Sequence, residues 1–285
     1  MKRFLTALML ISCFSCAFGA VVPWADIWTN TGYLTTNGES NNFSAFLLRS
    51  EGKVGLRAEE SIIPLEPYVA YYGVLSQDKN YWNNNCAYGA GLRLMPFTSY
   101  QSTDWTNEWI KDLKLFSEVL RMSVLNDKAT ADVDKIKTSD FRVGVDVWHE
   151  WNLKEIDNKA PWAEIWGNLS YRQTSFFAEA NNFPNNQFNT YLLYLQSKWG
   201  MHFDGGIRPY VCSYLTYSGV PKSWLNSFYY GLGLRVEPFR EQKDPPEMLK
   251  KFKMFLEVLG ISWLKENEGR PSSDFRFGVD FTFGR

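Results

Sequence analysis

The 285-residue chain has few of the features that define disulfide scaffolds, nucleic-acid-binding proteins or helical membrane proteins. Of its 4 cysteines, only Cys86 and Cys212 lie beyond the first 20 residues. We expect them to be unpaired thiols, with a single disulfide in an oxidising compartment as the alternative. The net charge of −1 argues against a nucleic-acid partner, because such proteins usually carry a basic face. Beyond residue 20 no stretch reaches the roughly 20 apolar residues of a spanning helix, so any passage through a membrane must use strands.

Residues suited to catalysis or metal binding are also scarce. The 2 histidines, His149 and His202, occupy unrelated positions, and Leu153 stands where a zinc-protease helix would place its second histidine. No serine motif supports a Ser-His-Asp arrangement, and the pair Gly89 and Gly91 lacks the third glycine of a dinucleotide-binding loop. We therefore predict no enzyme, no metal site and no cofactor. A lipid hydrolase that uses one of the histidines is the enzymatic alternative.

The first 20 residues have the order of a secretory signal. Lys2 and Arg3 are followed by an apolar run, residues 4–11, and then by small residues. We predict a signal peptide over 1–20 with cleavage near Gly19 or Ala20. A lipoprotein box ending at Cys13 is the alternative. Either reading sends residues 21–285 out of the cytoplasm.

The remaining chain contains an internal duplication, with repeats at about 24–152 and 162–285. Short matching segments recur in the same order, about 134 to 142 positions apart. They are Trp24-Ala25-Asp26 with Trp162-Ala163-Glu164, Pro67-Tyr68-Val69 with Pro209-Tyr210-Val211, Tyr88-Gly89-Ala90-Gly91-Leu92-Arg93 with Tyr230-Gly231-Leu232-Gly233-Leu234-Arg235, Glu118-Val119-Leu120 with Glu257-Val258-Leu259, and Asp140-Phe141-Arg142 with Asp274-Phe275-Arg276. This order predicts two related halves.

Apolar and polar residues alternate with period two, as they do in half-exposed strands. In the last segment Phe275, Phe277 and Val279 oppose Arg276 and Asp280. We predict six strands per repeat, centred on 24–35, 44–58, 66–76, 86–96, 113–125, 139–151, 162–174, 189–203, 208–218, 228–238, 252–264 and 273–284. Segments 113–125 and 252–264 also fit helical spacing, which would make the fold α+β. Strand is the preferred reading.

Twelve strands of about ten residues with one greasy face predict an all-β, antiparallel transmembrane barrel. Closure removes the sheet edges that lipid cannot satisfy. The aromatic content of 17%, including 12 Trp, is typical of interfacial belts. We expect a monomer in the outer membrane of a Gram-negative bacterium. A soluble periplasmic β-protein is the alternative, since its core would also produce alternation.

Both repeats place charged residues on the inward face. They are Asp26 and Glu164, Arg93 and Arg235, Glu118 and Glu257, Arg142 and Arg276, and Asp146 and Asp280. One hypothesis is that oppositely charged rows cross-brace a narrow interior, where a charge needs a partner. The other is a selective pore or polysaccharide path, with Trp28 and Trp166 as aromatic platforms for sugar. Either hypothesis implies a lumen with twofold symmetry.

The order of Trp-Ala-acid, Tyr-Gly-x-Gly-Leu-Arg, Glu-Val-Leu and Asp-Phe-Arg-x-Gly-Val-Asp resembles the C-terminal barrel region of bacteriophage adsorption proteins of enterobacteria. That resemblance implies an outer-membrane barrel tied to exopolysaccharide export. The chain lacks the family's long helical-repeat region. We predict a porin-like barrel that passes a small polar solute or polysaccharide, or acts as a surface or phage receptor. A structural or adhesive barrel without transport is the alternative.

Overall fold

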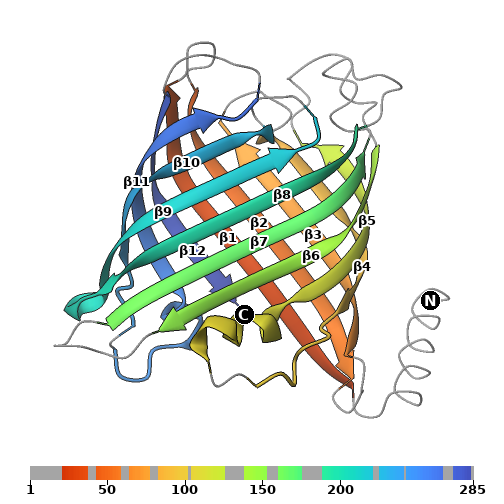
Figure 1. Ribbon diagram of the computed structural model, residues 1–285, viewed down its shortest axis with the longest axis horizontal. Helices are drawn as coiled ribbons and strands as arrows, with labels where there is room; N and C mark the ends of the chain where they lie inside the picture. Colours follow the sequence, from red (N-terminus) through yellow and green to blue (C-terminus); the bar gives the residue numbers. More distant parts are fainter. Residues whose placement is uncertain are drawn as a thin grey trace.

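The computed structural model describes residues 21–37, 43–58, 64–77, 83–101, 104–125, 138–152, 160–174, 188–220, 225–240, 242–265 and 272–283. The predicted signal peptide lies outside these residues. The described chain forms one closed barrel in which each strand pairs antiparallel with its sequence neighbours and β12 pairs back onto β1 (Figure 1). The strands are β1 Val21–Asn37, β2 Phe43–Ala58, β3 Leu65–Ser76, β4 Asn85–Leu94, β5 Lys114–Val124, β6 Thr138–Asn152, β7 Ala160–Thr174, β8 Phe188–His202, β9 Ile207–Ser218, β10 Ser227–Val236, β11 Phe252–Trp263 and β12 Ser272–Phe283.

The prediction of an antiparallel barrel of about 12 strands is confirmed, including its two uncertain members. Segments 113–125 and 252–264 are strands β5 and β11, not helices. They are strands despite their helical spacing because each is hydrogen-bonded to a neighbour on both sides. One face of each strand points to the lumen and the other to the outside, which matches the period-two pattern. Cys86 and Cys212 are free thiols, as expected.

Apolar side chains point outward from the wall and stay exposed. Val69 and Val119 are each 62% exposed and Leu232 is 65% exposed. The inward positions of the same strands hold buried charges such as Glu66, Arg93 and Glu118. A water-soluble protein buries its apolar face and exposes its charges, so this barrel has the reversed arrangement of a protein surrounded by lipid.

Aromatic side chains of the outward rows gather near one rim. We call this rim the loop end, and the opposite rim, where β1 begins and β12 ends, the termini end. Neighbouring rings touch around the loop end, with centroid distances of 5.2 Å for Tyr33–Phe46, 5.6 Å for Tyr33–Phe277 and 5.3 Å for Tyr171–Tyr191. Aliphatic residues such as Val69 occupy the middle of the wall. An aliphatic band bordered by aromatic rings is the surface pattern of a membrane-spanning barrel.

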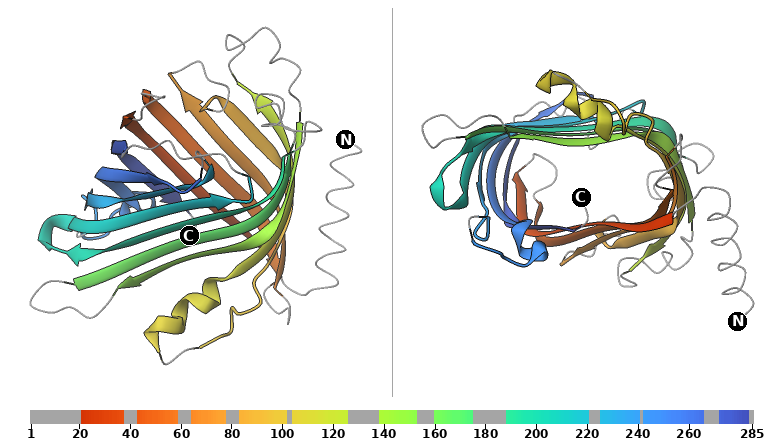
Figure 2. Two further views of the ribbon diagram at one scale, coloured as in Figure 1. Left: turned by 45° about the horizontal axis from the view of Figure 1, so that its top comes forward. Right: turned by 90° about the horizontal axis from the view of Figure 1, so that it is seen from below.

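The barrel is a flattened oval when seen along its axis (Figure 2, right). Glycines on the inward rows leave room for large rings from the neighbouring strand. Gly91 pairs with Tyr68 and Gly233 pairs with Tyr210, and a Cβ at either glycine would lie within 2.4 Å of the tyrosine ring. Each tyrosine can therefore cross its glycine strand and reach the strand beyond.

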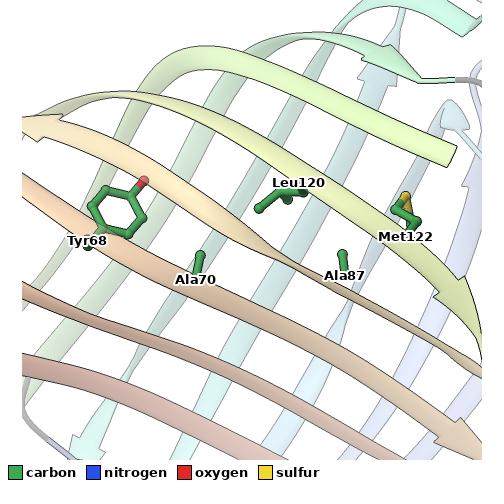
Figure 3. Close-up of a cluster of buried hydrophobic side chains, with 5 residues drawn as sticks. All are labelled: Tyr68, Ala70, Ala87, Leu120 and Met122. Carbon is green, nitrogen blue, oxygen red and sulfur yellow. The ribbon is translucent and has the colours of Figure 1, made fainter. Parts of the chain in front are cut away.

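Small apolar patches also line the interior, so the inward face is not charged throughout. One patch is formed by Tyr68 and Ala70 of β3, Ala87 of β4, and Leu120 and Met122 of β5 (Figure 3). A second is formed by Trp162, Tyr210, Cys212, Tyr214 and Leu259. The first patch flanks the buried Glu118, and the second flanks the buried Glu257.

Two connections at the termini end carry helical turns. The 3-10 helix η2, Trp105–Asp112, joins β4 to β5 and packs against β6, on the outside of the wall (Figure 2). The short helix α2, Glu247–Lys250, joins β10 to β11. A tighter turn, η6 Asp204–Gly206, joins β8 to β9, with Gly205 and Gly206 at positive φ. Among the described residues, no helix has the length and apolar character needed to cross a membrane.

Candidate functional site in the lumen

Glu118 of β5 is the centre of one buried cluster in the lumen. The hydroxyls of Tyr68 and Tyr72 donate to its Oε1 at 2.8 and 2.5 Å. Lys53 Nζ lies 3.8 Å away, and Arg142 Nη1 lies 3.9 Å from the other oxygen. Glu118 is 1% exposed, so a carboxylate here requires these partners. The cluster links β2, β3, β5 and β6 across the glycine strand β4.

Glu257 of β11 is the centre of a matching cluster. The hydroxyl of Tyr210 donates to its Oε1 at 2.8 Å, and that of Tyr214 donates to the same oxygen. Lys198 Nζ lies 3.4 Å away, and Arg276 is the direct cross-strand partner of Glu257. Four strands, β8, β9, β11 and β12, are thereby joined across β10.

Nearer the termini end, a second pair of clusters is built on arginine and tryptophan. In one, Arg93 lies with its guanidinium carbon 3.8 Å from the ring centroid of Trp24 and pairs with Glu66 at 2.5 Å. In the other, Arg235 pairs with Glu164 at 3.1 Å and lies 4.7 Å from the ring centroid of Trp162. Stacking and ion pairing together fix each guanidinium in one orientation.

One position differs in sign between these two clusters. Glu66 precedes Pro67 in β3, and Arg208 precedes Pro209 in β9. Glu66 is fully buried and accepts hydrogen bonds from Arg93 and also from Arg57. Arg208 is 1% exposed and donates to Glu237 at 2.8 Å and to Glu150 at 3.0 Å. The expectation of a lumen with twofold symmetry is therefore wrong at this position.

A cavity of about 330 Å³ lies between the clusters. Three indoles, Trp28, Trp148 and Trp166, form part of its wall together with Tyr194. The rings of Trp166 and Tyr194 are 4.6 Å apart, and Trp166 donates to Asp146 at 3.0 Å. The charged residues of its wall are Arg49, Glu51, Glu164, Lys198, Arg235, Lys253, Glu257, Arg276 and Asp280. Both predicted aromatic platforms, Trp28 and Trp166, and five of the ten predicted lumen charges thus line one space.

A second cavity, of about 290 Å³, adjoins the first at the termini end. The two share Trp148, Lys253 and Thr282 in their walls. We call this second cavity the mouth. Its other wall residues are Glu150, Arg208, Glu237, Arg240, Lys250 and Lys251. The shared residues make the two cavities parts of one interior path.

Glu237 stands in the mouth directly after the last residue of β10. Burial alone would raise the pKa of this carboxyl, but the charges of Arg208 and Lys253 and the hydrogen bonds from Arg240 and Arg208 lower the pKa to about 2. Glu237 is therefore ionised at neutral pH and fixes the two arginines beside it.

All ten predicted lumen charges lie on the inward rows, and most are paired. Arg93 reaches Asp26 at 4.0 Å as well as Glu66. Arg142 and Arg276 pair with Asp140 and Asp274 at 2.5 and 2.6 Å, and Asp280 accepts a bond from Asn30 at 2.5 Å. Several residues of the two cavities and the buried clusters were not among the predicted lumen residues: Arg49, Lys53, Glu66, Lys198, Arg208, Glu237, Lys253 and the tyrosines that bond Glu118 and Glu257. The reversed sign before Pro67 and Pro209 was visible in the repeat and could have indicated Glu66 and Arg208.

His149 does not face the lumen. It lies on the outward row of β6, where η2 covers it, and it is 5% exposed. Its Nδ1 lies 2.5 Å from Asp112, and its ring contacts Trp151 at 4.5 Å. Among the described residues, no group of three or more His, Cys, Asp or Glu could hold a metal ion. His149 thus has a structural environment and is separated by the wall from the cavities.

Comparison with known proteins gives matches only among solved structures. No protein-family model matches the chain, and no curated protein matches it. The β domain of the Bordetella autotransporter Brka is 12% identical with a TM-score of 0.38, over 92% of this chain and 99% of that chain. An outer membrane channel from Pseudomonas putida F1 is 10% identical with a TM-score of 0.38, over 93% and 96%. The outer membrane protein opdK from Pseudomonas aeruginosa is 7% identical with a TM-score of 0.32, over 92% and 99%.

Identities and scores this low assign neither a family nor a solute. The resemblance to phage adsorption proteins stays a prediction, because no family model matches the chain. The duplication also stays a prediction from the sequence.

Proposed function

We propose that the barrel spans the outer membrane as a monomer and passes a small polar solute through its lumen. The observation that carries the proposal is that the outer face of the wall is apolar whereas its inner face is charged. Exposed aliphatic and aromatic side chains point outward, and two adjoining cavities lined by charges and indoles lie within. Lipid suits the first surface, and water with a polar solute suits the second.

The soluble alternative is disfavoured by the outward rows. Side chains such as Tyr191 at 67% and Leu232 at 65% exposure stand in continuous apolar rows, not as scattered single residues. Contiguous apolar surface of this extent is rare on a water-soluble monomer.

A two-sided cysteine test examines passage directly. Thr282 lines both cavities, whereas Val54 is 49% exposed on the outward row. The full chain with its 4 cysteines replaced by serine would carry either Thr282→Cys or Val54→Cys and be inserted into planar lipid bilayers. We expect channel currents from both, and a charged, water-soluble thiol reagent should reduce the current only with Thr282→Cys.

A plugged, structural barrel is the second candidate. The ion-paired clusters around Glu118 and Glu257 favour it, because they brace neighbouring strands inside the lumen. It predicts a folded protein that migrates differently before and after heating and inserts into bilayers but gives no current. Absence of current from correctly inserted protein would reject passage in favour of this candidate.

A further inference from the structure

The wall of the central cavity holds five cationic side chains and four carboxylates, so it has an excess of one positive charge. Each of its carboxylates already has a protein partner: Glu164 pairs with Arg235, Glu257 with Lys198, Asp280 with Asn30 and Glu51 with Lys53. Arg49 of β2 differs from these residues. Its guanidinium is exposed to the cavity and has no hydrogen-bond or ion-pair partner among the described residues.

The mouth adds to this positive field. Five cationic side chains and two carboxylates line it. The cations are Arg208, Arg240, Lys250, Lys251 and Lys253, and the acids are Glu150 and Glu237. A narrow space with low-dielectric walls and an excess of one sign attracts solutes of the opposite sign. An anion would therefore meet a favourable potential from the termini end to Arg49.

The aromatic residues of the central cavity indicate what the anionic solute carries besides its negative charge. Trp28 is the cross-strand partner of Glu51, so Arg49 is its diagonal neighbour on the inward face, at a Cα separation of about 7–8 Å. This spacing leaves room for one pyranose ring, with an apolar ring face against an indole and a carboxylate at the guanidinium. Gln196, Asn30 and the carboxylates in the wall supply partners for hydroxyl groups.

We propose that the solute is a carboxylated sugar of the uronate class, held by Arg49 and stacked on the indoles of the central cavity. This inference rests on the proposed function, since it assigns the ligand of the same lumen. A neutral sugar would leave Arg49 without a counter-charge. A simple aromatic acid has no sugar hydroxyl groups to donate to the amide and carboxylate oxygens of the wall, which can each accept a further hydrogen bond.

The test measures binding to the detergent-solubilised full chain. D-galacturonate and D-galactose are titrated by calorimetry and by tryptophan fluorescence. We expect galacturonate to bind about tenfold or more tightly than galactose, with a preference that weakens as salt is raised. Arg49→Gln should remove about tenfold of galacturonate affinity and leave galactose unchanged, while Arg49→Lys should retain part of the preference.

The matched control is Arg121→Gln. Arg121 is exposed on the outward row of β5 and lines neither cavity, so its loss should change neither titration. Equal affinity for the two sugars, no binding of either, or an unchanged preference in Arg49→Gln would each overturn the inference.

The two proposals fail separately. Currents that thiol labelling blocks at Thr282→Cys, together with no galacturonate preference, would leave passage standing and reject the uronate. Galacturonate binding that depends on Arg49, without any current, would reject passage and keep the ligand assignment.

Discussion

The half of the barrel from β1 to β6 and the half from β7 to β12 share their buried centres but differ at the termini end. Glu118 and Glu257 hold the same set of two tyrosines and a lysine. The connections differ. Residues 95–113 carry η2 outside the wall, with Asp112 on His149, whereas residues 237–251 bring lysines to the mouth. The clusters around Glu118 and Glu257 are common to both halves and brace the wall. The two connections differ, and only the one after β10 adds lysines to the mouth.

The largest expected effect on the free energy of unfolding comes from reversing the charge at Glu66 or at Arg208. Glu66→Arg would place a third cation beside Arg57 and Arg93, and Arg208→Glu would place a third carboxylate beside Glu150 and Glu237. Removing one partner of a buried pair costs about 3–5 kcal/mol, so we expect reversal to cost about 5 kcal/mol or more. Urea unfolding of the detergent-folded protein measures it. Tolerance of either reversal would mean that the halves are interchangeable here.

The next effect tests whether the shared centres are equivalent. Glu118→Ala and Glu257→Ala each leave two tyrosine hydroxyls and a lysine without their common acceptor. We expect both to lower the free energy of unfolding by about 3–5 kcal/mol, and by similar amounts. Glu51→Ala is the control, because Glu51 is partly exposed and, within the described part of the chain, forms its ion pair with Lys53. A large difference between the two centres would contradict their common structural role.

These two centres also show how far sequence reasoning reaches. Period-two alternation predicted all twelve strands, because the wall separates lipid from lumen residue by residue and imposes that period. The repeat predicted the paired glutamates. The tyrosines that reach them were not predicted as partners, since Tyr68 contacts Glu118 only after Gly91 lets its ring cross a strand. Such contacts depend on the strand register and on how far a side chain reaches. The period-two alternation of apolar and polar residues indicates neither.

The cavity was predicted in part. Trp28 and Trp166 were predicted as platforms and do line it, but Arg49 and Lys253 were not among the predicted lumen charges. Neither belongs to a repeated motif, so a search for conserved pairs between halves could not find them. The helix η2 was missed because its residues lie between two strands in a segment without period-two alternation.

A smaller effect, dependent on pH, should appear only at the mouth of the second half. The pKa of Glu237 is lowered to about 2, so its ionised form stabilises the fold above pH about 4.5 and that contribution is lost as the pH falls toward 2. We expect on the order of 2–3 kcal/mol to be lost over this range. Stability measured against pH for the wild type and Glu237→Gln should agree near pH 2, separate as the pH rises to about 4.5, and keep that difference above it. Curves that stay parallel between pH 2 and 4.5 would show that Glu237 is not the group responsible.

The smallest effect concerns the outside of the first half. His149→Ala removes the partner of Asp112 on the lipid-facing side of β6, where η2 covers the wall. One hydrogen bond at a partly covered rim contributes about 1 kcal/mol, so the global stability should change little. The helix η2 should instead become more accessible to protease at Lys111, which is exposed, while channel current stays as in the wild type. The conservative Asp112→Asn, with His149 in place, should keep part of the protection, because its amide can still bond the imidazole. A change in current with either variant would mean that the outer segment of the first half, like the basic segment of the second, acts on the lumen.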